Sequence, residues 1–541
     1  MKRAAVTPNL LDRAIGYVDP ARAARRLQAR VAIDMLSESP TRSGNRPRRR
    51  LLGGADAATD QAWNLIDQRF DSRELVRSNG IAASAINTNV TRAVGTGLAL
   101  TPQPRRDILG WSEEQAREWA MRVRAEFSLW ADSTECDITG VQNFYDKQDL
   151  TLRAVLESGD AFTLMPDGER TATMPYALRL QTLEADRCGN EGGRQDSATM
   201  AGGVRLGDGG RHEAYFIYDR HPGSLLGVGG LRDGRWYDRV GAKSGRRIVL
   251  HHFKQLRPEQ PRGTPYLAPV MALFQDLDTY SDAEIKAAVA AASIALISET
   301  PSGAPDPIGS AGDGGGSSSS AATTDPTAIK LKSGSIVGLL PGEKFESFNP
   351  GRPNPNFERF VQAVIDALGA GTFIGPEMLM KKYSTSYVAA RAAFLDAWKH
   401  LLGIRTTIVV RSYCQPVYET WLAEAVAIGR IPAPGFFADP LVRWAYTRAM
   451  WTGDSQGSIN PKDEVKALVE AVDNRLCSRE RAEWELFGTD WNETYDTKKA
   501  EHDRLSADGM LPAPKAGAAA PASAEERDDG DPAQQGKKEI A

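Results

Sequence analysis

A long helical pattern between a proline-rich turn and a low-complexity segment constrains this chain more than any other feature. Three prolines and a glycine between positions 258 and 265 prevent a helix from starting before Tyr266. Beyond this point apolar residues recur mostly every three or four positions, as one side of a helix requires. They are Leu267, Val270, Met271, Phe274, Leu277 and Ile285. The pattern predicts a helix over 266–297, and the Gly/Ser-rich residues 301–328 after it predict a flexible insertion, so we expect the helix to reach away from its domain.

Between residues 176 and 250 the apolar pattern shifts towards a period of two, which is typical of β-strands. Short alternating runs with Gly-rich turns between them predict a small antiparallel sheet or barrel. The histidines in or beside this region are His212, His221, His251 and His252. Their separations match no compact ligand motif, so we expect no metal site and no cofactor.

Several further helices can be placed from the sequence. Ser72 is an N-cap candidate for a first helix, and a second helix is expected over 82–94. A third runs from Trp111 to Trp130, and its three tryptophans are expected to be core anchors rather than a cofactor site. A long helix is expected over 386–412, with a break at Pro416.

The long helix and the turn before it also resemble a known family. The stretches HHFKQLRPEQPRGTPYLAPVM and LDTYSDAEIKAA, within residues 251–288, resemble lambda-type bacteriophage portal proteins, which typically read RPxQxRGxPxLAPV before a helix with YxDAE. The agreement recurs in order at SRELVRSNG, VGTGL, CDITGVQNFYDKQDL, LQTLEADRC, LPGE, SYVAARAA and PVYETWLAEAVAIGRI. It covers about residues 70–500, nearly all of the chain that is expected to fold.

The resemblance implies an α+β portal fold that assembles as a ring. Its parts would be a mixed α/β wing, long stem helices, a small clip and an α-helical C-terminal region on the crown side. The expected boundaries are 1–55 for a basic, disordered arm, 56–265 for the wing, 266–297 for the first stem helix, 298–350 for the clip, 351–371 for the second stem helix, 372–500 for a channel loop with crown-side helices, and 501–541 for a disordered tail.

The resemblance also implies a function that is physical rather than catalytic. A portal ring, expected to hold twelve copies, stands at one vertex of a phage head, starts capsid assembly and passes double-stranded DNA without reading its sequence. The partners implied are the terminase large subunit, the major capsid and scaffold or protease proteins, and a head-completion connector. The expected location is the virion of a tailed phage or prophage, after assembly in the bacterial host cytoplasm, with no membrane contact.

Two groups of residues are candidates for facing DNA in such a channel. Lys381, Lys382 and Tyr383 occupy a turn where the family often has an acidic residue, and lysines at a constriction would form a basic ring that touches phosphates. The acids of the long helix, which are Asp276, Asp278, Asp282 and Glu284, could form an acidic wall along which DNA slides. The alternatives are solvated lysines on an outer loop and carboxylates on an outer surface.

Other residues match the family motifs and are expected to be structural. They are Gly95, Gly97, Gln148, Arg153, Arg257, Gly263, Asp282, Tyr387, Arg391 and Trp421. The Gly95-x-Gly97 pair follows a helix, so we interpret it as a cap and turn rather than a phosphate loop.

Charge and cysteine usage leave one further function open. Residues 1–50 hold twelve Lys or Arg against four Asp or Glu, a net charge of +8, although the whole chain carries −4. Such an arm could bind nucleic acid, so a non-enzymatic DNA-binding protein that acts through its arm is the first alternative. The four cysteines lie far apart without a CxxC pair, and no apolar run is long enough to span a membrane.

An enzyme is the second alternative. Ser384 and Ser386 lie near Lys381, which suggests a Ser–Lys hydrolase, but the SxxK spacing is missing. The sequence also holds no Walker A motif and no HExxH. We therefore expect no catalytic residues.

Overall fold

The computed structural model describes residues 56–62, 64–224, 233–293, 296–299, 336–339, 356–383, 386–455, 461–488 and 491–510. The chain divides into two units at residue 60, and the second unit, 61–541, carries the features discussed below. The predicted insertion 301–328, the whole predicted arm 1–55 and most of the predicted tail lie outside the described residues. No helix in the described part of the chain is long and apolar enough to cross a membrane.

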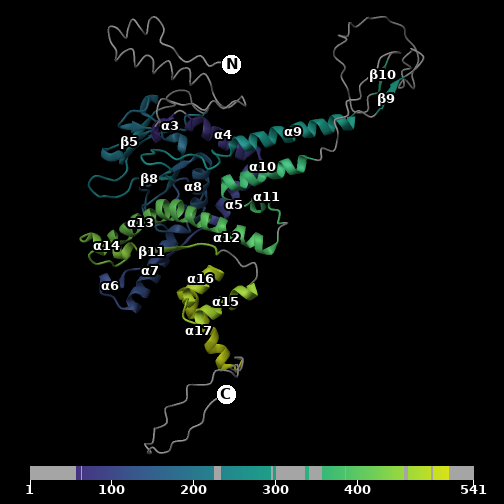
Figure 1. The fold of residues 1–541 in the computed structure, drawn as a ribbon. Helices are drawn as coiled ribbons and strands as arrows, with labels where there is room; N and C mark the ends of the chain where they lie inside the picture. The colour runs from purple at the N-terminus through teal and green to yellow at the C-terminus, as the bar shows by residue number, and fades with distance from the viewer. Residues whose placement is uncertain are drawn as a thin grey trace, which may run out of the picture. The chain divides into compact units, whose positions relative to one another are not determined.

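Helices make up most of the described chain (Figure 1). The α-helices are α3 (Ala57–Ala62), α4 (Leu65–Ser78), α5 (Gly80–Ala93), α6 (Arg106–Leu109), α7 (Glu113–Ala131), α8 (Phe144–Ser158), α9 (Met271–Ser293), α10 (Phe357–Thr372), α11 (Pro376–Met380), α12 (Tyr387–Ile404), α13 (Gln415–Ala427), α14 (Pro440–Thr447), α15 (Pro461–Asp473), α16 (Arg479–Phe487) and α17 (Trp491–Ala507). A π-helix, η5 (Arg405–Cys414), joins α12 to α13, and short 3-10 turns are η1 (Thr134–Cys136), η2 (Ala185–Arg187), η3 (Glu191–Gly193) and η4 (Asp208–Gly210).

The strands form two antiparallel sheets and two strand pairs. They are β1 (Ala99–Pro102), β2 (Asp160–Leu164), β3 (Gln181–Glu184), β4 (Met200–Ala201), β5 (Val204–Leu206), β6 (His212–Tyr218), β7 (Gly234–Asp238), β8 (Val249–Phe253), β9 (Leu296–Glu299), β10 (Ile336–Leu339) and β11 (Ala449–Thr452). The first sheet has the order β3-β2-β8 and the second β4-β5-β6-β7, while β1 pairs with β11 and β9 pairs in parallel with β10. The fold is therefore α+β, with two open sheets rather than a barrel among the described strands.

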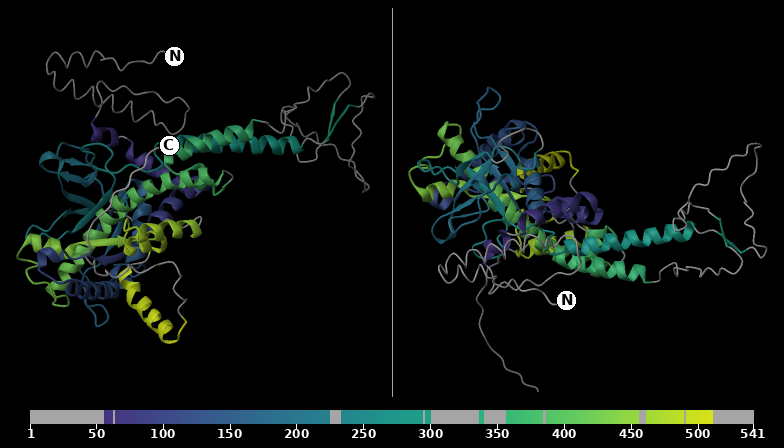
Figure 2. Two further views of the ribbon diagram at one scale, coloured as in Figure 1. Left: turned by 60° about the horizontal axis from the view of Figure 1, so that its bottom comes forward. Right: turned by 90° about the horizontal axis from the view of Figure 1, so that it is seen from above.

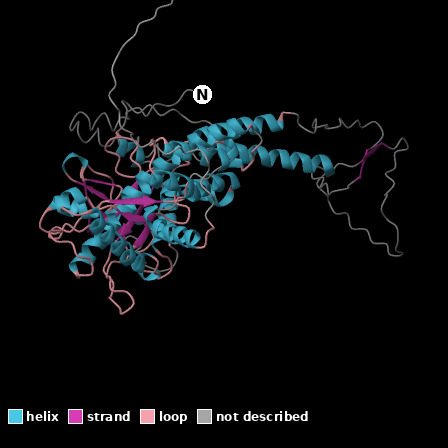
Figure 3. Ribbon diagram, turned by 90° about the horizontal axis from the view of Figure 1, so that it is seen from below, coloured by secondary structure: helices cyan, strands magenta, loops and turns pink. Residues whose placement is uncertain are grey.

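Two apolar cores hold these elements together. The larger one surrounds Phe127 of α7, whose ring lies 5.1 Å from Trp421 of α13 and 5.4 Å from Phe144 of α8. The smaller one lies between the two sheets, where Phe162 of β2 meets Tyr215 of β6 at 5.4 Å. Figure 3 shows the strands within the body and helices around them. Aromatic rings at helical or alternating spacing thus fill the interior, as the sequence predicts for the tryptophans of α7.

The first stem helix is shorter than predicted. The sequence favours 266–297, but α9 begins at Met271 and ends at Ser293. Its predicted first turn is a series of tight turns, in which Ala268 N donates to Pro265 O at 3.1 Å. Pro265 lacks the N–H that a preceding helical turn would use, so the regular ladder starts only after these turns. The partner helix α10 begins at Phe357 and ends at Thr372, close to the predicted 351–371.

The break predicted at Pro416 is wrong. Helix α12 passes through the π-helix η5 into α13, and Pro416 lies in the first turn of α13. Within η5 the backbone bonds reach five residues back, as from Gln415 N to Val410 O. Proline is tolerated in the first turn of a helix, where its missing N–H is not needed. The β-branched side chains of residues 406–410 are crowded in a regular α-helix, and the wider π-helix gives them more room.

Two other boundaries differ from the prediction. Ser72 is not an N-cap but lies buried inside α4, which begins at Leu65. Tertiary burial of Leu65 and Arg69 extends this helix past its local start signal. At the other end, α17 continues to Ala507, past residue 500 where the tail was expected to begin, because KKAEHDRL contains no Pro or Gly.

Candidate functional site

Helix α9 is the element that carries most of the candidate residues, and its first half is packed against the body. Phe274 and Leu277 are 0% and 4% exposed. Figures 1 and 2 show α9 leading away from the sheets, with α10 beside it. The two helices meet through Tyr280, whose ring lies 5.7 Å from Phe357 and 4.6 Å from Phe360. A two-helix arm therefore projects from the region of the sheets.

Asn79 fixes the corner between α4, α5 and α9. Its side-chain oxygen accepts from Ile81 N and Ala82 N, both at 2.9 Å, and so caps α5. Its side-chain nitrogen donates to Asp278 Oδ1 at 2.7 Å. Of the four predicted wall residues, Asp278 is therefore engaged at the base of the arm.

The four acids of α9 do not form one face. Asp276, Asp278 and Asp282 are exposed and Glu284 is half-buried. At about 100° per residue, Asp278 and Asp282 share one side, whereas Asp276 lies well away from both. The sequence identified the exposed carboxylates, but the helix distributes them over different sides.

The turn with the two lysines follows α11. Lys381 adopts a left-handed conformation (φ 56°) that ends this helix, and its Nζ lies 2.5 Å from Thr88 Oγ1 on α5. Burial lowers the pKa of Lys381, and Arg92 acts in the same direction. Lys382 and Tyr383 are exposed. Lys381 is exposed as well, so the turn presents both lysines and the tyrosine, and Lys381 also contacts α5.

The side chains suggested for a hydrolase are engaged elsewhere. The Ser386 hydroxyl accepts from Ala389 N at 3.4 Å and caps α12. Lys381 contacts Thr88, and Ser384 lies outside the described residues. The described atoms therefore form no nucleophile–base pair at this turn.

The glycine and glutamine motif residues join α5 to α8. Gly95 and Gly97 both have positive φ, 63° and 108°, and close the turn after α5 as predicted. A Cβ on Gly97 would lie 2.5 Å from Tyr145 Cβ. The buried side chain of Gln148 accepts from Leu98 N at 2.7 Å and donates to Leu98 O at 3.2 Å. These residues form packing and hydrogen-bond contacts between α5 and α8.

The other family-motif residues also lie at structural contacts. Arg153 donates to Asn87 Oδ1 at 2.9 Å, and Arg391 of α12 pairs with Glu464 of α15. Trp421 is fully buried.

Of two further motif residues, one makes a backbone contact and the other begins a helix. The Arg257 backbone donates to Gln260 Oε1 at 3.1 Å. Tyr387 is the first residue of α12, and its side chain lies outside the described atoms.

One cluster has the composition of a metal site. His221 Nε2 lies 3.1 Å from Glu184 Oε2 and 3.5 Å from Asp186 Oδ2. Arg73 pairs with both carboxylates. Because a guanidinium already compensates the two acids, we interpret the cluster as an ion-pair network rather than a cation site.

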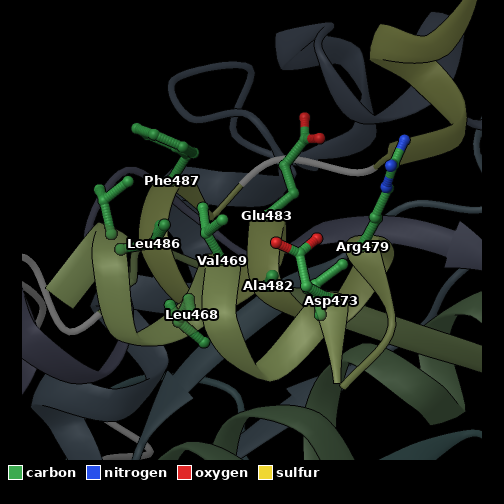
Figure 4. Close-up of a pocket in the computed structure, with 10 residues that line it drawn as sticks. Leu468, Val469, Asp473, Arg479, Ala482, Glu483, Leu486 and Phe487 are labelled. Carbon is green, nitrogen blue, oxygen red and sulfur yellow. The ribbon is translucent and has the colours of Figure 1, made fainter. Parts of the chain in front are cut away.

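A groove of about 310 Å³ opens between α15 and α16 (Figure 4). Apolar side chains such as Leu468, Val469 and Leu486 line it. The carboxylate of Glu483 beside it is bound by Lys498 and, at 2.6 Å, by the Thr494 hydroxyl. Of the three charged residues that line the groove, Asp473, Arg479 and Glu483, the last is thus already bound within the chain.

Comparison with known proteins agrees with the predicted resemblance. The profile described as "Phage portal protein, lambda family" matches residues 42–405. The chain is 25% identical over 501 residues to the portal protein of Escherichia phage N15, which covers 88% of this chain and 92% of that one. It is 24% identical over 482 residues to portal protein B of Escherichia phage lambda, which covers 86% and 88%. From the extent of these matches, the chain belongs to the lambda family of phage portal proteins.

Proposed function

We propose that copies of this chain close into a ring, twelve in the capsid, through which double-stranded DNA enters and leaves a phage head. The observation that carries the ring is the apolar surface left on the two-helix arm. Ile285 and Val289 in the outer part of α9 are 61% and 59% exposed, and Phe360 on α10 is 45% exposed. Apolar side chains that continue a buried stripe into solvent indicate a partner, and a second copy offers the matching helices.

The same geometry selects the acid that would face DNA. Asp276 and Ile285 are nine residues apart, two and a half helical turns, so they lie on opposite sides of α9. If Ile285 faces a neighbouring copy, Asp276 faces away from that contact, whereas Asp282 lies one turn from Ile285 at its edge. We therefore assign the acidic wall first to Asp276, with Asp278, Asp282 and Glu284 nearer to packed surfaces.

A second DNA contact is proposed at the turn after α11. Lys382 and Tyr383 are exposed there, and twelve copies of Lys382 would form a ring of positive charge that touches phosphates without reading bases. The test is Lys382→Glu, with Lys399→Glu at an exposed site of α12 as the matched control. We expect slower DNA packaging by the first variant alone, with rings intact in both, and equal packaging by the two variants would contradict the assignment.

The partners in this role are the terminase large subunit during packaging, the capsid and scaffold or protease proteins during assembly, and a head-completion connector afterwards. The chain acts as a structural component at the capsid vertex of the virion and is assembled in the host cytoplasm. The portal names of the two relatives support this proposal. The basic arm offers a DNA-binding function of its own, and deletion of residues 1–50 separates the two roles because a ring would survive it.

The mass and shape of the purified protein test the proposal directly. Twelve chains of 58.8 kDa form a particle of about 706 kDa, which light scattering measures and negative-stain microscopy images. A ring of about this mass with a central hole is the expected result. A strict monomer at all salt and protein concentrations, also after addition of capsid and scaffold proteins, would overturn it.

A further inference from the structure

A buried ionic cluster lies where the chain leaves the sheets for α9. Asp160, the first residue of β2, is 0% exposed. Its carboxylate accepts from Arg262 through Nε and, at 3.1 Å, through Nη2, and from Arg69 Nη2 at 2.8 Å. We name Asp160, Arg69 and Arg262 the root clasp. It joins α4, the first sheet and the segment that leads to α9.

Arg262 extends the clasp to the second sheet. Its Nη1 donates to Cys188 O at 2.9 Å and to Gly202 O, and its Nη2 donates to Ala185 O at 2.7 Å. Gly202 forms the turn between β4 and β5, and Ala185 directly follows β3. All five N–H groups of one guanidinium are therefore used, and they hold both sheets to one point of the chain.

The backbone around the clasp is equally constrained. A Cβ on Gly263 would lie 1.9 Å from Gly159 O. The two backbone segments can therefore be in contact only because both residues are glycine. Gln61 and Gln260 each donate to Arg262 O at 2.7 Å. The loop thus has one conformation that satisfies its buried polar groups.

The residues between the root clasp and α9 are also held by contacts with the body. Tyr266 N donates to Leu156 O at 2.9 Å, and Leu267 and Val270 are 0% and 2% exposed. Val270 packs so closely on α10 that a Cβ on Gly371 would lie 2.3 Å from it. The segment that Arg262 holds therefore helps to determine the direction of α9, together with the bond from Asn79 to Asp278 and the buried side chain of Phe274.

We propose that the root clasp is a positioning device that fixes the direction of α9 relative to the two sheets and thereby sets the angle between neighbouring copies in the ring. This step rests on the proposed ring. Rings of twelve and thirteen copies need angles of about 30° and about 28° per subunit, so a deviation of about 2° changes the count. Because all five N–H groups of Arg262 are bonded, any other placement of this side chain would leave buried polar groups unpaired, and this cost provides the stiffness.

The charge on the carboxylate supports this role. Burial alone would raise the pKa of Asp160, but Arg262 and Arg69 hold it well below its usual range. The clasp therefore remains ionised at any pH at which a phage assembles.

Arg262→Lys tests the proposal in the full-length chain, because lysine keeps the charge but cannot reach two carboxylate oxygens and three carbonyls. Arg246→Lys is the matched control. Arg246 holds the other end of β2 near the surface, through Met165 O at 3.2 Å and Asp167. Spin labels at the exposed sites Lys286→Cys on α9 and Asp238→Cys on β7, with Cys477→Ser, report the direction of α9.

We expect Arg262→Lys to widen the label–label distance distribution at least about twofold and to spread the subunit count in native mass spectrometry, while the control matches wild type. An unchanged width and count would overturn the proposal. If Arg262→Lys does not fold, Arg69→Lys takes its place with the same two criteria. This variant loses the bond from Nε to Ser158 O at 2.9 Å and the ion pair of Nη1 with Asp186 at 3.8 Å. If wild type forms no ring, the proposed function fails, and the label distances in the unassembled chain still decide the clasp.

Discussion

Mild acid should weaken the sheet that anchors α9, because two neutral histidines are buried in it. His251 and His252 follow each other in β8, and their side chains are 3% and 0% exposed. Burial lowers the pKa of His251 to about 4, against the opposing pull of Asp160, and that of His252 to about 3. His251 also faces the guanidinium groups of Arg69 and Arg262, which disfavour a further positive charge.

The sign of the pH effect follows from proton binding. In the unfolded chain a histidine has a pKa of about 6.5, so between that value and the folded pKa the unfolded state binds more protons. Stability is therefore complete above about pH 6.5 and falls as the pH drops towards the folded pKa. Between pH 7.5 and 5.5 each of the two groups costs about 1.35 kcal/mol, so the pair lowers the free energy of unfolding by about 2.7 kcal/mol. Protonation of Asp160 affects stability only below about pH 4, so it does not contribute between pH 7.5 and 5.5.

Urea unfolding followed by tryptophan fluorescence at pH 7.5, 6.5 and 5.5 measures this loss. His252→Gln removes one titrating ring from between the Thr163 and Ser412 hydroxyls, each 2.9 Å from a ring nitrogen. We expect the variant to be less stable at pH 7.5 and to lose about 1.35 kcal/mol less than wild type on acidification. His251 and the half-buried His212, whose pKa burial also lowers to about 4, still titrate in the variant. The exposed His502 provides the control, since His502→Gln should keep the full loss. Equal losses in His252→Gln and wild type would refute the reasoning.

Three further changes probe the body of the protein, each measured as the free energy of unfolding. Asn79→Ala removes the cap of α5 and its bond to α9, and we expect a loss of about 1–2 kcal/mol. Trp421→Ala empties a fully buried aromatic site and should cost about 3–5 kcal/mol, whereas Trp421→Phe should cost less. Gly97→Ala forces a Cβ to within 2.5 Å of a side chain at φ 108° and should cost about 1–3 kcal/mol, more than Gly110→Ala, which has a positive φ but open space.

The sequence predicts those features that depend on local patterns. The turn before Tyr266 and the periodicity of α9 and α10 follow from neighbouring residues, and the structure contains them. Strand β6 is also present, but five residues in a row are buried in it instead of every second one, because it lies between neighbouring strands and over the smaller core. Ser72 shows the limit of such patterns. A serine before a run of helix formers reads as a cap, but burial of Leu65 and Arg69 carries the helix through it.

The root clasp could not be predicted, because its members are far apart in the chain. Asp160 reads as a turn residue after Gly159, and Arg262 reads as one more charge in a loop. The two charged groups are in contact only because the fold brings the loop with Arg262 next to the start of β2. The useful signal was Gly159 and Gly263 together, since two glycines in separate turns allow two backbones to touch.

The periodicity of α9 also explains why the sequence alone cannot separate contacts within the chain from contacts between copies. An apolar stripe has the same spacing whether the chain itself or a second copy covers it, so Phe274 and Ile285 belong to one predicted helix face. The structure separates them, because Phe274 is buried while Ile285 and Val289 are mostly exposed. Among the described residues, packing within the chain therefore covers this stripe at Phe274 but not at Ile285. A solvated helix gains nothing from a continued apolar stripe, so the exposed Ile285 is where the proposed ring would place a neighbouring copy.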